Sequence, residues 1–277
     1  MPTRLLAIVA TAAFVSATVT STAEPVAVRF AEGLVHGFLT LRTLDGGVIA
    51  NGDLIQSARG SRVTSRLVFR FKDGSLLDET AVFSQQGHFR LITDHLVQKG
   101  PAFSKPLEMS IDRNSGRVVV RYSDDDGHPK VEDERMELQD DLANGLVLTL
   151  LKNVRPEALP PSLSMIAPTP KPRLVKLAIT TAGRERFSTG TTGRSATHYV
   201  VKIDIGGLAG LVAPLLGKQP ADSHVWILGG DAPAFVKFEG PLALGAPPWR
   251  IELASPVWNA GQTATDGAGP TRPPARR

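Results

Sequence analysis

The chain has 277 residues, of which 42% are hydrophobic and 21% are charged, so it can bury a sizeable core in one large domain or two smaller ones. The formal net charge is +4, and basic residues alternate with acidic ones along the expected strands, which argues against a nucleic-acid-binding surface. The absence of cysteine excludes disulfides, thiol catalysis, cysteine-ligated zinc, iron–sulfur clusters and a lipid-modified N-terminal cysteine.

Residues 1–23 have the pattern of a secretory signal peptide. Arg4 supplies a positive charge, 5–15 form an apolar run, and small residues at 21–23 fit a cleavage site before Glu24. The alternative is a membrane anchor, but the apolar run is about 11 residues against the ~20 that span a bilayer. We therefore expect a periplasmic or secreted protein with no membrane span in the mature chain.

Residues 62–98 alternate between apolar and polar side chains and are cut by turns at Asp73-Gly74 and Gln86-Gly87. Period-two alternation between glycine-containing turns predicts an antiparallel meander with one buried and one solvent-facing side. Further strands are expected at 26–30, 34–42, 48–56, 107–111, 117–122, 131–138, 174–180, 198–205, 225–228, 235–238 and 249–254.

Two segments change to a helical period. In 140–154, leucines recur at helical spacing, and Asp140 or Asp141 could cap the helix. In 207–217, Leu208, Leu211 and Leu215 form one aliphatic face. The predicted fold is therefore mainly β, a curved antiparallel sheet or open half-barrel with two short covering helices.

A proline-rich segment at 155–172 divides the strands into two groups. Proline at this density suits neither a helix interior nor a central strand, so the segment is either a domain boundary or an extended crossover. The second group has few strands for an independent core, which favours a single β-rich body over 24–258 with a sub-boundary in this segment. Residues 259–277, rich in Gly, Pro, Thr, Ala and Arg, are expected to be a disordered tail.

No pattern in the chain identifies a catalytic residue, a cofactor or a metal site. The six histidines lack metal-ligand spacing, although histidines distant in sequence could still meet in the fold. The acidic run Asp124–Asp126 with Gly127 is explained more simply as a hairpin turn than as a calcium loop. Carboxylates such as Asp78 and Glu79 are interpreted as solvated rows on strand faces.

A wide curved sheet cannot fill its own concave face, so a helix, side chains or a ligand must cover it. We expect a ligand-facing concavity under the helix formed by Leu208, Leu211 and Leu215. The sheet residues predicted to line it are Leu67, Phe69, Phe71, Phe83, Phe89 and Leu91. The alternative is that these side chains are ordinary core.

In the order of its elements, the chain resembles periplasmic lipoprotein-carrier and lipid-handling proteins of the LolA/LolB kind. The elements are a signal peptide, a long meander (62–98, continuing through 117–138), a leucine-rich helix and further strands. The resemblance covers 26–255 in element order and implies a concave apolar face, covered by helices, that takes a lipid or lipidated ligand. The glycine-rich short helix and the proline-rich insertion depart from that pattern.

These features favour a non-catalytic periplasmic or secreted protein that binds a lipid or another apolar or amphipathic ligand. One alternative is a structural or interaction protein of the cell envelope that uses exposed strand edges and the tail to bind a protein partner. Another is a secreted hydrolase whose carboxylates converge only in the fold.

Overall fold

A computed structural model of the chain describes residues 25–189, 192–204 and 220–254. Its strands form one antiparallel, 14-stranded sheet in the order β8-β7-β6-β5-β4-β3-β2-β1-β14-β13-β12-β11-β10-β9. The first half comprises β1 (Val35–Thr43), β2 (Val48–Arg59), β3 (Arg62–Phe71), β4 (Leu76–Gln86), β5 (His88–Lys99), β6 (Leu107–Asp112), β7 (Arg117–Ser123) and β8 (Pro129–Arg135). The second half comprises β9 (Leu163–Ala167), β10 (Arg173–Thr189), β11 (Thr192–Asp204), β12 (Ser223–Leu228), β13 (Ala234–Gly240) and β14 (Trp249–Leu253).

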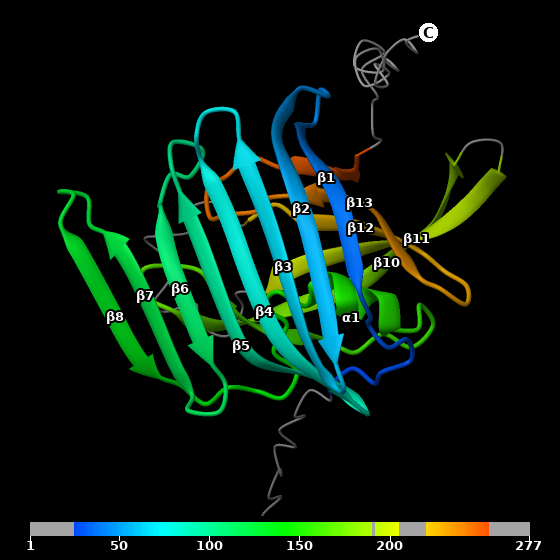
Figure 1. Ribbon diagram of the computed structural model, residues 1–277, viewed down its shortest axis with the longest axis horizontal. Coiled ribbons are helices and arrows are strands. Elements are labelled where there is room, and N and C mark those ends of the chain that lie inside the picture. The colour runs from blue at the N-terminus through cyan, green and yellow to red at the C-terminus, as the bar shows by residue number, and fades with distance from the viewer. Residues whose placement is uncertain (1–24, 190–191, 205–219, 255–277) are drawn as a thin grey trace, which may run out of the picture.

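The sheet is strongly curved and stays open. Figure 1 shows β1–β8 as one broad face, with β10–β13 passing behind β1–β4. The two halves are joined through the β1–β14 pair, in which Leu41 lies opposite Ile251. Strands from both sides of the proline-rich segment therefore belong to one sheet, and the predicted mainly-β, curved antiparallel architecture is confirmed.

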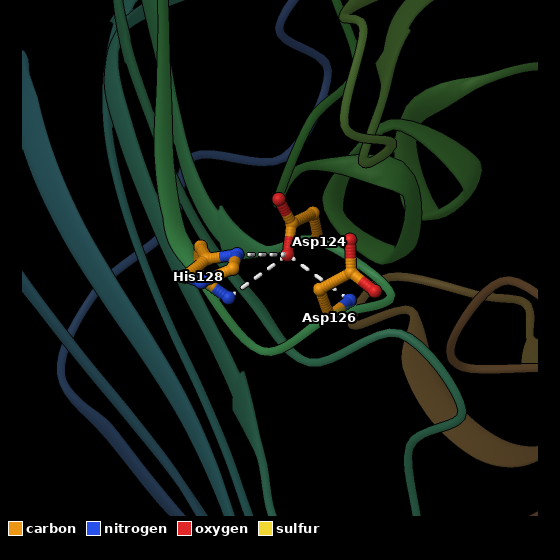
Figure 2. A group of neighbouring side chains, drawn as sticks. All are labelled: Asp124, Asp126 and His128. Carbon is orange, nitrogen blue, oxygen red and sulfur yellow. Dashed lines mark hydrogen bonds and ion pairs between the residues drawn. The ribbon is translucent and has the colours of Figure 1, made fainter.

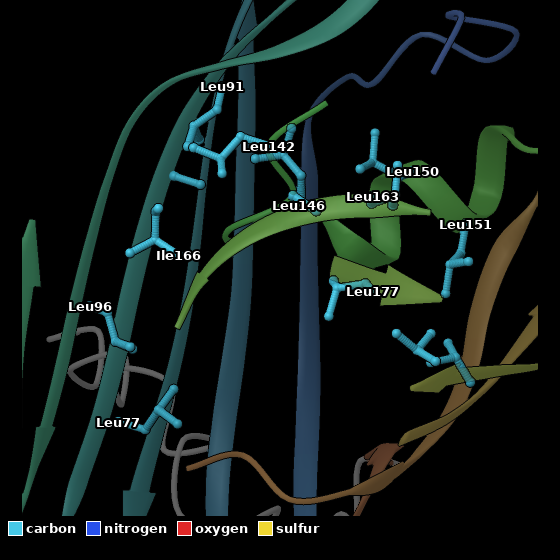
Figure 3. Packing of buried hydrophobic residues seen from close by; sticks show 14 of the residues in the cluster. Leu77, Leu91, Leu96, Leu142, Leu146, Leu150, Leu151, Leu163, Ile166 and Leu177 are labelled. Carbon is cyan, nitrogen blue, oxygen red and sulfur yellow. The ribbon is translucent and has the colours of Figure 1, made fainter. Parts of the chain in front are cut away.

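The space inside the curve is closed by a helix and a short extended segment. Helix α1 (Val147–Asn153) and the preceding residues Leu142 and Leu146 lie between the two halves of the sheet (Figure 3). Asn153 fixes the helix to the start of the described chain, because its Oδ1 accepts hydrogen bonds from the backbone N–H groups of Arg29 and Phe30 at 2.9 and 2.7 Å.

The free edge of β9 is covered by residues that come before α1. The backbone of Ala143 donates to the carbonyl of Ser164 at 2.8 Å. The side chain of Asn144 then bonds both backbone groups of Ile166: Nδ2 donates to its carbonyl at 2.9 Å, and Oδ1 accepts from its N–H at 2.8 Å. The amide thus takes the place of another strand at this edge.

Several element boundaries differ from the sequence prediction. The predicted helix over 140–154 is wrong in its first half, because Gly145 has φ of +64° and the helix begins only after Leu146, with no side-chain cap. The predicted strand 26–30 is reduced to a single bridge between Ala27 and His88. Strand β9 arises inside the proline-rich segment, and β10 and β11 form a much longer hairpin than expected.

Three predicted segments lie outside the described residues: the signal peptide at 1–23, the helix at 207–217 and the tail at 259–277. Within the described ranges, no helix has the length and apolar character needed to cross a membrane.

Candidate functional site

The aromatic residues predicted to line a concavity do lie on the inward side of the sheet. Phe69 and Phe83 are completely buried, and Phe89 and Leu91 are nearly so. They belong to the same apolar cluster as Leu142, Leu146, Leu150, Leu151, Leu163 and Ile166 (Figure 3). Along this part of the concave face, the protein's own side chains occupy the space beside the predicted lining residues.

The other predicted lining residues have different surroundings. Leu67 is partly buried and packs against the edge of the cluster. Phe71 is 8% exposed and lies at the end of β3, beside a hollow in the surface. Leu208, Leu211 and Leu215 lie outside the described residues.

The hollow at Phe71 has a volume of about 280 Å³ and is mostly apolar. It forms where β1 and β3 end and where β2 and β14 begin. Its walls are Thr43, Val48, Ile49, Phe71, Lys72, Asp73, Ala102 and Trp249. The hollow is close in size to the smallest ligand pockets, which start at about 300 Å³.

Two aromatic rings of the wall, Phe71 and Trp249, pack against each other and against a third ring, that of Phe103. The centroid of Phe71 lies 5.5 Å from those of both Phe103 and Trp249, in edge-to-face arrangements. Phe103 and Trp249 also meet edge-to-face at 6.4 Å. Such pairs add stability beyond the area that they bury, so the wall is already in place before any ligand arrives.

Charged groups flank the hollow. Lys72 and Asp73 are exposed, and Asp73 Oδ1 accepts a hydrogen bond from the backbone N–H of Ser75 at 2.9 Å. Within the part of the chain that the structure describes, no carboxylate lies within 4.0 Å of the Lys72 ammonium. An apolar cavity with an ammonium that makes no ion pair, and a carboxylate one residue further on, suits an amphipathic ligand.

A second unusual feature is a pair of acidic side chains on the inward face of β4 and β5. Asp94 is 1% exposed, and neither of its carboxylate oxygens has a hydrogen-bond partner. Burial, and next the charge of Glu79, raise the pKa of Asp94 well above its ordinary value. Burial likewise raises the pKa of Glu79 to about 7, although its side chain keeps some solvent contact.

The backbone at Gly145 packs directly on this acidic pair. A Cβ at Gly145 would lie 3.0 Å from Asp94 Oδ1, 3.6 Å from the Glu79 carboxyl carbon and 2.5 Å from the Ala81 Cβ. The pair therefore lies between β4, β5 and the segment leading into α1, and no positive side chain of the described ranges is paired to it. Both pKa values are raised because ionisation in this setting is costly.

The interpretation of Glu79 as a solvated residue is wrong. It has the same parity as Leu77, Ala81 and Phe83, which all face the core. That parity was available in the sequence, because alternation along a strand applies to charged residues as well as apolar ones. Asp78, one residue earlier, does point outward and pairs with Arg66 at 2.6 Å.

The acidic run after β7 does bring three potential metal ligands together. One ligand atom from each of Asp124, Asp126 and His128 lies within 4.8 Å of the others (Figure 2). However, Asp124 Oδ1 already accepts from the backbone N–H groups of Asp126 and His128 at 3.1 and 2.8 Å. Its Oδ2 lies 3.3 Å from the Lys130 ammonium. These contacts account for the cluster as the polar turn between β7 and β8.

No protein-family model matches the chain, and no curated protein matches its sequence. A solved structure described as a β-barrel-like protein of the domain of unknown function DUF1849, from Brucella abortus, covers 83% of this chain and 100% of its own. The two share 12% identity with a TM-score of 0.46. The likeness concerns the fold only, and the resemblance to LolA/LolB-like carriers stays a prediction.

Proposed function

We propose that this protein is a non-catalytic, periplasmic or secreted protein that binds a lipid or another apolar or amphipathic ligand. The hollow beside Phe71 and Trp249 receives part of that ligand. The observation that supports this function is a preformed apolar hollow with aromatic walls, with the charged side chains of Lys72 and Asp73 beside it.

The size of the hollow limits what it holds. A volume of about 280 Å³ accommodates one end of a lipid, with the remainder lying along the surface or under a covering segment. If about 200 Å² of apolar ligand surface were buried, the gross gain would be about 5 kcal/mol before the costs of association. This corresponds to weak, reversible binding, as suits a protein that takes up and releases its ligand.

The test fills the hollow. Ala102 is partly buried in its wall, so Ala102→Phe places a ring in the space that the ligand would occupy. The matched control is Val131→Phe, which adds the same ring at a residue that is 61% exposed on β8. We expect a fluorescent fatty-acid probe to bind the wild type and the control and to bind Ala102→Phe at least about tenfold more weakly.

Two results would refute the proposal: no uptake of the probe by the wild type, or equal uptake by Ala102→Phe and wild type. Native mass spectrometry of the purified protein gives an independent measurement, because a lipid carried through purification appears as added mass. Unchanged thermal melting of the variants shows that loss of binding does not come from loss of folding.

The hydrolase alternative has less support from the described residues. The carboxylates that the fold brings together, Glu79 and Asp94, are enclosed by apolar surroundings instead of facing an open polar cleft. The interaction alternative has one feature in its favour: β8 is an exposed edge strand, although its alternating charges discourage indiscriminate strand pairing.

A further inference from the structure

We propose that His198 and His224, on the outward face of β11 and β12, bind a divalent transition-metal ion, with Glu185 of β10 orienting His198. This site lies on the opposite side of the sheet from the core and is independent of the proposed ligand hollow. Tyr199 and Val201 have the opposite parity to His198 on β11, and their side chains are buried in the core at 2% and 6% exposure. His198 therefore faces outward.

Cross-strand pairing brings the two histidines together. In the β11–β12 register, Trp226 lies opposite His198 and His224 lies opposite Val200, so the two histidines are diagonal neighbours on one face. Their closest ring nitrogens, His198 Nε2 and His224 Nδ1, are 2.9 Å apart. The residues are 26 positions apart in sequence, which explains why no local spacing revealed them.

Glu185 prepares His198 as a ligand. Its Oε1 lies 3.2 Å from His198 Nδ1 and accepts a hydrogen bond from the Nδ1–H group, which leaves the lone pair on Nε2. A carboxylate that fixes the tautomer of a histidine in this way is the usual outer partner of metal-binding imidazoles.

The His198 ring is also held in position by stacking. Its centroid lies 4.2 Å from that of Trp226, with an angle of 14° between the planes. The Lys237 ammonium covers the Trp226 ring at 3.8 Å from the centroid. A ring fixed by a neighbouring indole and a carboxylate is preorganised, so little rotamer freedom is lost when a metal binds.

The charges around the pair permit a cation. Lys237 covers the neighbouring Trp226 ring, and its charge is offset by Glu239 at 3.2 Å. Glu239 also pairs with Arg250 at 2.7 Å and lies opposite His224 in the β12–β13 register. Together with Glu185, which is 54% exposed, Glu239 keeps the local charge from being strongly positive.

The type of ligand indicates which metals fit. The 2.9 Å between the two nitrogens is the length of a hydrogen bond between the rings, so a movement of a few tenths of an ångström brings both nitrogens onto one ion. Imidazole ligands suit Cu²⁺, Ni²⁺ and Zn²⁺, and among these Cu²⁺ is expected to bind most tightly. On binding, the ion replaces the proton between the rings, and that proton moves from Nδ1 to Nε2 of His224.

The test uses the untagged full chain titrated with Cu²⁺ at pH 7.5 in the presence of glycine as a weak competitor. We expect one tightly bound Cu²⁺, with electron paramagnetic resonance that shows two imidazole nitrogens. His224→Ala should weaken binding more than about tenfold and leave one imidazole, and Glu185→Gln should weaken it about tenfold. Ni²⁺ should bind more weakly than Cu²⁺.

The sheet supplies matched controls. His36 pairs with Asp53 at 3.1 Å, and His95 pairs with Glu108 at 3.1 Å, but neither has a second histidine beside it among the described residues. His36→Ala and His95→Ala should bind Cu²⁺ as the wild type does. Equal affinity in the wild type and His224→Ala, or an equal loss in the controls, would overturn the proposal. His224→Ala leaves the His198–Trp226 stack intact, and circular dichroism confirms its folding.

Discussion

Glu79 and Asp94 face each other across β4 and β5 as diagonal neighbours, because Asp94 is paired with Ala81 and Glu79 is paired with Leu96. Both carboxyl groups point to the inward side of the sheet, where Gly145 packs on them. No cation from residues 25–189, 192–204 or 220–254 forms an ion pair with these two acids, so their protonation state is linked to the stability of the contact between β4, β5 and the segment before α1.

The first prediction concerns Glu79→Gln. The folded pKa of Glu79 is raised from 4.5 to about 7, so its stabilising contribution is complete below pH 4.5 and is lost as the pH rises through about 7. The wild type should therefore be more stable at pH 5 than at pH 8. Glu79→Gln should gain about 1–2 kcal/mol at pH 8, less than the whole shift implies because the side chain keeps some solvent contact.

Urea unfolding at pH 5, 6.5 and 8 measures this difference. Glu134→Gln, on the edge strand β8, is the control that removes a carboxylate outside the core. The explanation would be wrong if both variants showed the same change of stability with pH.

The second prediction concerns Gly145→Ala. A Cβ there would approach the Ala81 Cβ to 2.5 Å, and the backbone has a φ of +64°, so we expect a loss of about 2–4 kcal/mol. Gly127→Ala is the matched control, since its φ of +83° is also positive but nothing lies within 4 Å of the added carbon. Its cost should be only about 1 kcal/mol. Similar losses in the two variants would show that packing on the acidic pair is unimportant.

The third prediction concerns Asn144→Ala, which removes the amide that covers β9. The N–H and C=O of Ile166 would lose their partners in a buried setting, at a cost of about 2–4 kcal/mol. Hydrogen exchange at the Ile166 amide should become much faster while exchange in β3 stays slow. Asn51→Ala, at an exposed asparagine of β2, should change neither quantity.

The fourth prediction concerns the charge beside the hollow. Lys72→Ala should reduce the affinity for an anionic amphiphile about two- to fivefold, because exposed charges contribute under about 1 kcal/mol. The reduction should shrink at high salt and should be absent for an uncharged probe. Lys130→Ala, a lysine on β8, is the control, and an equal effect there would show that the charge acts without regard to the hollow.

The alternation in 62–98 was sufficient to predict the central meander. Phe69, Phe83 and Leu91 were placed on the buried side because period-two spacing is a local property of the strand. The same rule applied to Glu79 would have predicted the buried acid. Glu79 breaks the pattern of apolar residues inward and charged residues outward, and only its parity in β4 indicates its inward position.

The start of α1 could not be predicted from leucine spacing alone. Leu142 and Leu146 are buried as a helical pattern requires, but the backbone before α1 makes a bridge to Ser164 of β9 at Leu142 and then a turn over 144–146. The partner strand lies in the proline-rich segment, which by composition was expected to be a domain boundary or an extended crossover. Tertiary pairing overrode local propensity at this point.

By itself, the sequence determined the architecture: a cysteine-free chain of alternating strands that must curve around an apolar interior. Local periodicity carries that information, because each strand specifies its own buried side. The tertiary structure decided which distant groups meet. It placed Phe71 of β3 beside Trp249 of β14, Asp94 beneath Gly145, and His198 beside His224, since only strand order and register determine such contacts.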